Sequence, residues 1–183
     1  MEYFDIYNEN GIPTGEKVER SIAHKEGLLH AAVHIYIYRI NEGKLEILLQ
    51  KRADNKDSFP SCWDTSCAGH VSTGESFEKA SLKELREELG INITKRSLTH
   101  LFDQVVEKIN IFYSETFIDR EYNKVYALPL NVPESALRFQ KAEISALKWM
   151  EADLLLTQLE NKNPEYCIMP DTYKKVLTKL KSE

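Results

Sequence analysis

The segment from Ser76 to Gly90 constrains the fold most, because it has the pattern of an amphipathic helix with two different faces. At about 100° per residue, leucines at positions 82, 85 and 89 fall on one side of this helix. Glutamates at positions 84, 87 and 88 follow i, i+3, i+4 spacing and fall roughly opposite. Gly90 stands where a glycine commonly ends a helix. The helix must therefore bury its leucines against a core and turn its glutamates elsewhere.

Most other periodic segments have the composition of strands. They are expected at residues 3–7, 17–23, 31–40, 45–52, 63–67, 98–107, 111–118, 123–130 and 146–150. Residues 53–62 and 69–74 read as loops, and two further helices are expected at 151–160 and 171–181. Strands that come in runs with few helices between them indicate a mixed sheet packed by helices, an α+β arrangement within the α/β class, rather than a doubly wound parallel sheet.

The length of 183 residues suits one domain, here taken as residues 1–183. Within it we expect an N-terminal hairpin extension at 1–28, a core at 29–160 and a C-terminal helix at 161–183. No apolar run approaches the roughly 20 residues of a membrane span, and the N-terminus lacks the pattern of a secretory signal. These features predict a cytoplasmic protein with no membrane partner, and three cysteines without a signal predict reduced thiols.

Charge limits the partners further. The formal net charge is −5 and no long basic run is present, so no nucleic-acid partner is expected. The glutamates at 84, 87 and 88 repel one another on a shared face, which oxygen-preferring Mg²⁺ or Mn²⁺ would relieve. A solvated acidic face is the simpler alternative. The glycine-bounded loop from Gly69 to Gly74, followed by Glu75, favours a ligand site because glycine lets a ligand approach the backbone.

The same segment resembles the Nudix box. The matching positions are Gly69, Glu75, Lys83, Glu84, Leu85, Glu87, Glu88, Gly90 and Ile91. Lys83 replaces the arginine that orients a glutamate in the family, and it keeps the charge but loses the planar fork. The resemblance implies the Nudix fold, an α/β/α sandwich around a mixed sheet. It also implies Mg²⁺-dependent hydrolysis of a nucleoside diphosphate derivative or a similar small organic diphosphate. Metal ligands would be Glu84, Glu87, Glu88 and the Gly69 carbonyl, with a glutamate as general base.

Residues outside the box resemble the branch that contains isopentenyl-diphosphate isomerases and related hydrolases. The isomerases hold a metal with three histidines and two glutamates, and they use a cysteine directly before the Gly-His pair. His70 matches one histidine, and His24 and His30 lie near the places of the others. Asp119 and Glu121 match the acidic pair, but Ala68 stands in the place of the cysteine. Whether the three histidines form a second metal site is left open.

Neighbouring side chains on an extended segment point to opposite faces, so Cys67 is a poor substitute for a thiol at position 68. The full glutamate set and Ala68 favour a hydrolase, with an isomerase as the alternative and a non-catalytic nucleotide sensor as a further one. The predicted catalytic residues are Glu84, Glu87 and Glu121. Glu121 is also a predicted metal ligand, and Glu75 and Lys83 support the box. Lys51, Arg52 and His70 are the predicted substrate-binding residues. A homodimer through the N-terminal hairpin is compatible with the sequence.

Overall fold

The structure is a computed structural model that describes residues 1–56, 58–112 and 115–182, without side chains at 110–112, 115 and 116. Parts of the expected loop at 53–62, the expected strand at 111–118 and the C-terminal segment at 161–183 lie outside these residues. The elements are β1 (Tyr3–Tyr7), β2 (Pro13–Glu19), α1 (Arg20–Glu26), β3 (His30–Asn41), β4 (Lys44–Arg52), β5 (Trp63–Asp64), β6 (Cys67–His70), α2 (Phe77–Leu89), β7 (Thr99–Phe112), β8 (Glu115–Pro129), β9 (Ile144–Glu151), α3 (Ala152–Glu160) and α4 (Pro170–Leu180). Short 3-10 turns lie at Lys95–Ser97 and Glu134–Ala136.

Strand β3 is the centre of the sheet formed by the described residues. It pairs antiparallel with β1, β4 and β6 and parallel with β8, and β9 lies on the far side of β4. Both strand orientations therefore occur in one sheet, as expected from the sequence. Successive β3 residues face opposite sides, with Val33, Ile35 and Ile37 in one core and Tyr36 in the other.

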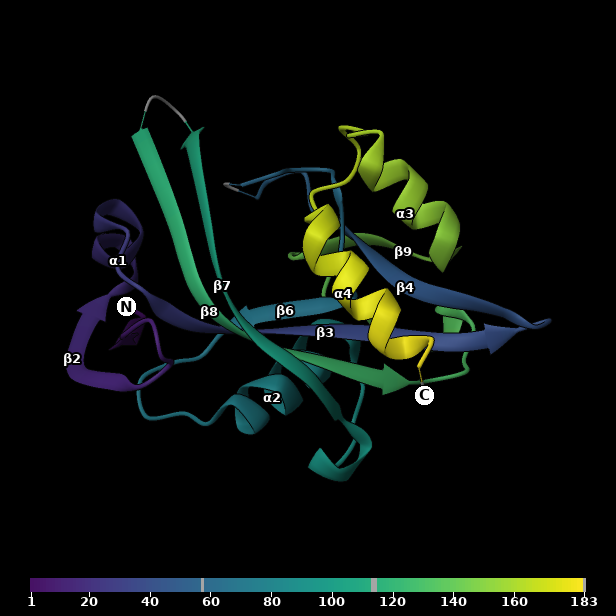
Figure 1. The fold of residues 1–183 in the computed structure, drawn as a ribbon, viewed down its shortest axis with the longest axis horizontal. Coiled ribbons are helices and arrows are strands. Elements are labelled where there is room, and N and C mark those ends of the chain that lie inside the picture. The colour runs from purple at the N-terminus through teal and green to yellow at the C-terminus, as the bar shows by residue number, and fades with distance from the viewer. Residues whose placement is uncertain (57, 113–114, 183) are drawn as a thin grey trace.

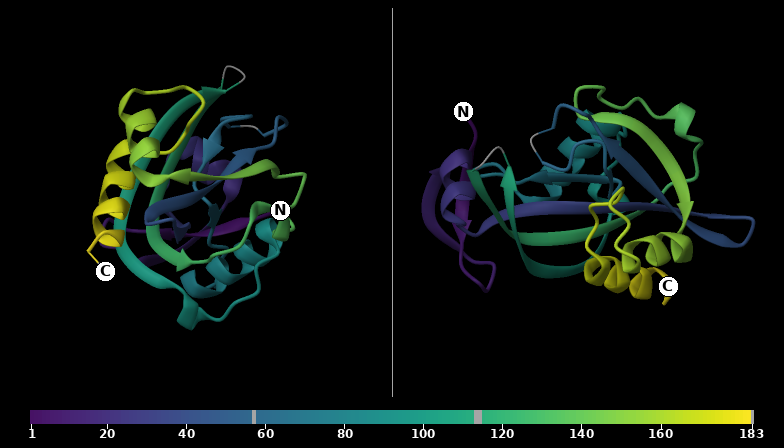
Figure 2. Two further views of the ribbon diagram at one scale, coloured as in Figure 1. Left: turned by 90° about the vertical axis from the view of Figure 1, so that its right-hand side faces the viewer. Right: turned by 90° about the horizontal axis from the view of Figure 1, so that it is seen from above.

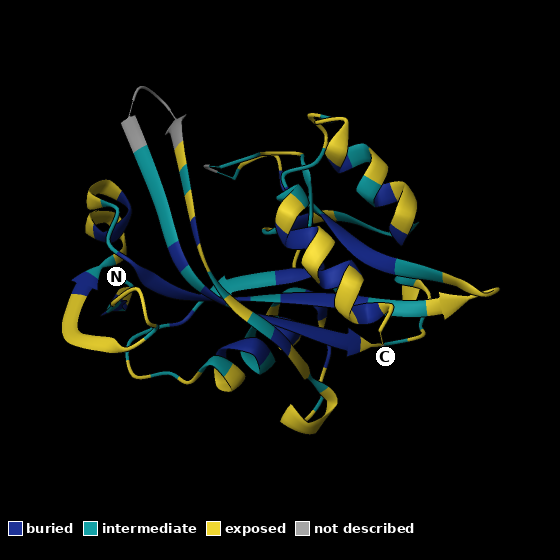
Figure 3. Cartoon of the chain, in the orientation of Figure 1, coloured by how far each residue is buried: buried dark blue, intermediate teal, exposed yellow. Residues whose placement is uncertain are grey.

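Helices cover both faces of this sheet (Figures 1 and 2). Helix α2 packs its buried Leu85 and Leu89 against one face, together with Val33 and Ile35 of β3. Helices α3 and α4 pack Leu155 and other apolar residues against the opposite face. Figure 3 shows the resulting pattern, with buried central strands and exposed outer sides of the helices. The predicted α/β/α sandwich around a mixed sheet is confirmed.

The N-terminal segment lies against the sheet and against the loop at residues 71–76 that leads into α2. Strand β1 forms a hairpin with β2, and Ile6 pairs with His30 of β3. Phe4 forms a bridge with Ser72, and the Asp5 carboxylate accepts a hydrogen bond of 2.8 Å from the Gly74 N–H. The first strand therefore fixes the loop that leads into α2.

Three element predictions needed correction. Residues 20–26 are helix α1 rather than strand, and Gly27 ends the helix in the left-handed conformation at φ 65°. The three strands expected between 98 and 130 are two long strands, β7 and β8, paired from Thr99–Ala127 to Phe112–Glu115. Charged residues at the sheet surface resembled breaks in the strand pattern. Gly69 and His70, expected in a loop, pair with Val33 and Ala32 as part of β6.

None of the helices in the described ranges is long and apolar enough to cross a bilayer.

Candidate active site and metal centre

A polar cavity of about 420 Å³ lies between α2, the ends of β6 and β8, and the N-terminal segment. The box glutamates Glu84, Glu87 and Glu88 form one wall. His24, His70, Asp119 and Glu121 line the same cavity. The i, i+3, i+4 spacing on α2 thus brings the three predicted glutamates to one cavity, while Leu85 and Leu89 are buried in the core.

The backbone at Gly69 lies directly against Glu84. A Cβ atom at position 69 would stand 2.5 Å from the Glu84 Cδ atom, well inside van der Waals contact. Glycine at this position is therefore needed to bring the β6 backbone and the Glu84 carboxylate together. This contact places the Gly69 backbone directly beside the Glu84 side chain.

Burial makes ionisation of Glu84 and Glu88, two carboxyl groups of the glutamate wall, unfavourable. Burial and the neighbouring Glu84 raise the pKa of Glu88 to about 8, and burial also raises the pKa of Glu84. Glu88 accepts a 3.4 Å hydrogen bond from the Gln50 amide, which does not neutralise it. Closely spaced, partly buried carboxylates of this kind suit a hard divalent cation such as Mg²⁺ or Mn²⁺.

Lys83 occupies the arginine position of the box and contacts two of its glutamates. Its Nζ atom lies 3.3 Å from Glu84 Oε1 and 3.6 Å from Glu75 Oε2. Although burial alone would lower the pKa of Lys83, Glu84 and Glu75 raise it, so the ammonium stays charged. Lys83 therefore bridges Glu75 and Glu84 as a single point charge instead of a planar fork.

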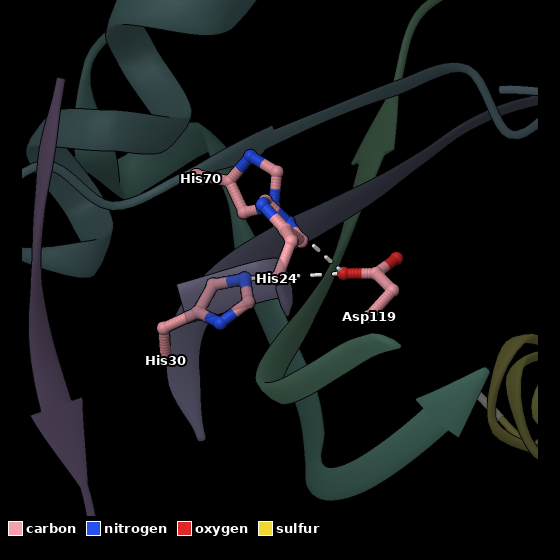
Figure 4. Close-up of side chains that lie close together, drawn as sticks. All are labelled: His24, His30, His70 and Asp119. Atoms are coloured by element: carbon pink, nitrogen blue, oxygen red, sulfur yellow. Dashed lines mark ion pairs between the residues drawn. The ribbon is translucent and has the colours of Figure 1, made fainter. Parts of the chain in front are cut away.

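A second group of donors converges beside the first. One ligand atom from each of His24, His30, His70 and Asp119 lies within 4.8 Å of the others. The Asp119 carboxylate lies 3.6 Å from His24 Nε2 and 3.8 Å from His30 Nε2, and Figure 4 shows the side chains pointing toward one another. Ligands at about 2.1 Å from a tetrahedral metal ion stand ~3.4 Å apart, close to these separations.

The hydrogen bonding of this group fits a metal site. His24 Nε2, His30 Nε2, His70 Nε2 and Asp119 Oδ1 are all buried and have no hydrogen-bond partner among the described residues. The Nδ1 atoms of His24 and His30 lie 2.9 Å from the Arg20 and Leu28 carbonyls, which leaves each Nε2 lone pair free. Buried polar atoms without partners are rare, and these residues are of the types that could hold a metal ion.

Aromatic rings hold the histidines in place. Phe4, fully buried, stacks on His30 at 4.7 Å and on His70 at 4.8 Å between ring centroids. Phe117 stacks on His24 at 4.3 Å. Burial and the neighbouring His70 lower the pKa of His30 to about 4, so this imidazole is neutral at physiological pH, as a metal ligand must be.

Glu121 lies between two imidazoles. Its carboxylate oxygens lie 3.4 Å from His34 Nε2 and 3.4 Å from His70 Nε2. Burial alone would raise the pKa of Glu121, but the adjacent His34 and His70 imidazoles hold it well below its usual range. Glu121 is therefore ionised and adjoins the histidine group through His70.

Strand β6 decides which side chain at positions 67 and 68 faces the cavity. Ala68 lines the cavity opposite His34, whereas Cys67 is fully buried in the core. Burial and the nearby Glu88 keep the pKa of the Cys67 thiol well above its usual range. Cys167 does line the cavity, but burial and Asp64 raise the pKa of its thiol as well. Both cysteines are therefore thiols rather than reactive thiolates.

Of the two strand-end cations predicted to grip phosphate, one lies at the cavity. Arg52 lines it and donates to the Ser58 carbonyl at 3.0 Å and to Asp64 at 3.3 Å. Lys51 alternates to the other side of β4, where its ammonium lies 5.7 Å from the centre of the Trp63 ring. Its predicted role in substrate binding therefore has no support from its position.

The cavity also contains residues that sequence reasoning missed. These are Gln50, Lys56, Lys108, Phe117, Glu143 and, behind the histidines, Phe4. Lys56 forms an ion pair with Glu143 and is therefore positioned by it. No local pattern marks any of these residues, because they meet only when distant strands pair. Lys56 and Lys108 add positive charge beside the glutamates, which suits an anionic substrate.

A family model described as the NUDIX domain matches residues 28–171. The chain belongs to the Nudix family. The Nudix match begins after Phe4 and His24, so the structure adds two residues of the site that the family model does not cover. The predicted family is therefore confirmed.

Two relatives illustrate the similarity. "Nudix hydrolase 3" of Arabidopsis thaliana is 35% identical over 173 residues, which cover 90% of this chain and 21% of that protein. This chain thus spans about a fifth of the length of the Arabidopsis relative. An isopentenyl-diphosphate Delta-isomerase of Aliivibrio fischeri is 32% identical over 185 residues, covering 98% of this chain and 97% of that protein. The names of Nudix relatives therefore include both activities considered from the sequence.

Solved structures show the same fold at lower identity. A Deinococcus radiodurans protein matches with a TM-score of 0.73 and 21% identity, covering 95% of this chain and 98% of the other. A binary complex of a Caenorhabditis elegans Ap4A hydrolase matches with a TM-score of 0.56 and 23% identity, covering 84% of this chain and 98% of the other. These similarities establish the Nudix fold.

Proposed function

We propose that this chain is a Mg²⁺-dependent hydrolase that cleaves the diphosphate linkage of a nucleoside diphosphate derivative or a similar organic pyrophosphate. The observation that carries the proposal is the position of Glu84, Glu87 and Glu88 on one wall of a cavity, beside the Gly69 backbone. Nudix membership and relatives named Nudix hydrolases support the same reaction class.

The glutamate wall would hold the cation through Glu84, Glu87, Glu88 and the Gly69 carbonyl. Bound Mg²⁺ or Mn²⁺ would neutralise charge on the phosphate oxygens and lower the pKa of the attacking water. Lys83 holds the Glu84 carboxylate in place. Arg52, Lys56 and Lys108 supply positive charge for the diphosphate, and His70 lines the same cavity.

Glu121 and Glu87 are the two candidates for the group that accepts a proton from the attacking water. The low pKa of Glu121 suits an ionised ligand or hydrogen-bond acceptor better than a general base. Glu87 is half-exposed at the cavity edge and contacts Arg86 at 3.3 Å. We therefore assign to Glu87 the acceptance of the proton from water, with Glu84 and Glu88 serving chiefly as ligands.

We also propose that His24, His30, His70 and Asp119 hold a second cation, with Glu121 beside it. Their buried atoms without hydrogen-bond partners support this role, and so does the lowered pKa of His30. Three imidazoles and a carboxylate favour a transition metal such as Mn²⁺ or Zn²⁺ over Mg²⁺. This ion would sit in the same cavity as the glutamate site.

The isomerase remains a second candidate, because an isomerase relative matches nearly the full length and the histidine group resembles its metal site. Against it, the alanine at position 68 offers no thiol to the cavity and Cys67 is buried. Cys167 is the thiol that lines the cavity, so it is the residue to test.

The test is a panel of nucleoside diphosphate compounds and prenyl diphosphates with Mg²⁺, with phosphate products and isomerised products both measured. We expect hydrolysis that Glu87→Gln removes with folding retained. Glu78→Gln, an exposed glutamate on the same helix, is the matched control. Isomerisation of isopentenyl diphosphate that is lost in Cys67→Ala or Cys167→Ala would replace the hydrolase with the isomerase. Binding without turnover would leave a nucleotide sensor.

A further inference from the structure

Strand β8 continues its row of polar side chains beyond the metal centre. Asp119, Glu121 and Asn123 lie at alternate positions, so they face the same side of the sheet. Asp119 belongs to the histidine group and Glu121 adjoins it, but Asn123 has no part in the proposed chemistry. Its side chain is 1% exposed, and its Oδ1 atom has no hydrogen-bond partner among the described residues.

Asn123 lines a small side cavity of about 20 Å³ that adjoins the main one. His34, Lys108 and Glu121 line both cavities, so the side cavity adjoins the main cavity at these residues. A volume of this size accepts about one water-sized group. It is too small for a separate ligand and suits one functional group of a molecule bound in the main cavity.

Two other polar residues of the side cavity, Gln104 and Thr172, already have partners. The Gln104 amide donates to Thr172 Oγ1 at 2.9 Å, and Gln104 Oε1 accepts from Lys175 at 3.4 Å. Asn123 Oδ1 is a buried acceptor of the side cavity to which no described residue donates a hydrogen bond. A buried acceptor without a donor is costly, which favours a bound group that donates a hydrogen bond there.

We propose that this side cavity is a subsite for a hydroxyl group on the non-phosphate part of the substrate, with Asn123 Oδ1 as the acceptor. The inference rests on the proposed hydrolase and narrows its substrate to hydroxylated organic diphosphates, as opposed to hydrocarbon diphosphates such as prenyl compounds. A hydrocarbon group would leave Asn123 Oδ1 unpaired beside the ionised Glu121. A site built to pair with a hydroxyl discriminates strongly against an analogue that lacks it.

The experiment compares alkyl and terminal hydroxyalkyl compounds of equal chain length, across a series of lengths. Binding is measured by titration calorimetry with methylenebisphosphonate analogues, whose P–C–P link cannot be hydrolysed, and turnover is measured with the matching diphosphates. At the length that reaches the side cavity, we expect the hydroxyl compound to bind roughly 10- to 100-fold more tightly.

Substitutions at position 123 locate the preference. Asn123→Leu should abolish it and should not lower the melting temperature, because it removes an unpaired buried acceptor. Asn123→Asp keeps an acceptor oxygen and should retain the preference. Asn92→Leu, at an exposed asparagine, is the matched control. Wild-type protein without a preference at any length, or a preference that survives in Asn123→Leu, would overturn the subsite.

The two proposals fail separately. A hydroxyl preference in binding, with no hydrolysis of any diphosphate, would remove the hydrolase and leave the subsite in place. Hydrolysis of both series at equal efficiency would retain the hydrolase and remove the subsite.

Discussion

Gly69 and Glu84 are in such close contact that the space for a Cβ atom at position 69 is already filled by the glutamate, with 2.5 Å to its Cδ atom. The two residues come from different elements, β6 and α2, and each limits where the other can lie. The position of the Glu84 carboxylate therefore depends on the absence of a Cβ atom at position 69.

Gly69→Ala should displace the Glu84 carboxylate and lower kcat/KM by about 100-fold, because a misplacement of about 1 Å in an active site can have that effect. Steady-state kinetics across a Mg²⁺ titration would measure it. The control is Gly43→Ala, where a Cβ meets no atom within 4 Å; it should cost stability and leave kinetics unchanged. Wild-type kinetics in Gly69→Ala would show that the glutamate wall tolerates displacement.

Lys83→Met should lower activity by about 10- to 100-fold, because Glu84 and Glu75 lose the cation that orients them. Lys83→Arg should retain activity, since its planar fork can engage both carboxylates. The apparent Mg²⁺ affinity, read from initial rates, should fall in Lys83→Met. Lys79→Met, an exposed lysine on the same helix, provides the control. Equal rates in all three variants would remove the orienting role from Lys83.

The histidine group should bind Mn²⁺ or Zn²⁺ and stabilise the native state. At a metal concentration 100-fold above Kd the gain is about 3 kcal/mol, or a rise in Tm of about 6–12 °C for a chain of this size. His30→Gln should remove the shift and lower the metal content measured by mass spectrometry. His100→Gln changes a histidine paired with Asp103 on β7 and should preserve both. A metal shift that persists in His30→Gln would place the ion elsewhere.

The stability of the metal-free protein should fall as pH rises through the range where Glu88 loses its proton. Burial raises the pKa of Glu88 from an ordinary 4.5 to about 8, so between these values the native state binds more protons than the unfolded chain. The free energy of unfolding therefore decreases with pH in this window, by on the order of a few kcal/mol. Urea unfolding at several pH values would measure the slope.

Glu88→Gln should flatten the decrease of unfolding free energy with pH. In the wild-type protein, Mg²⁺ should restore the stability that is lost near pH 8. Glu78→Gln, exposed on the same helix, should keep the wild-type slope. A slope unchanged in Glu88→Gln would assign the pH dependence to another group.

Local patterns predicted the parts of the fold that depend on neighbouring residues. The spacing of Glu84, Glu87 and Glu88 predicted a shared face, and the alternation of a strand predicted that Ala68 and Cys67 point opposite ways; the cavity and the core contain them accordingly. Ser76 and Gly90 mark the ends of α2, with the Ser76 hydroxyl accepting from the Lys79 N–H.

Long-range pairing determined the rest, and no local pattern could reveal it. His24 directly follows a segment that was expected to be a strand, and it approaches His70 because α1 packs beside β8. Lys51 and Arg52 are neighbouring cations at the end of β4, and the sequence alone does not distinguish them as phosphate-binding residues. The pairing of β4 with β5 and β9 determines which of the two side chains reaches the cavity. Charged residues along β7 and β8 hid two long strands that are continuous in the sheet.

The histidine group draws its four donors from α1, β3, β6 and β8. Only a chain in which the N-terminal helix, the central strand and the long β8 strand have all docked can offer the four atoms together. An ion bound there would link these elements to one another. Completion of folding would then depend on the metal concentration. Metal starvation would then loosen the N-terminal segment first, and that segment would become the point of entry for proteolysis.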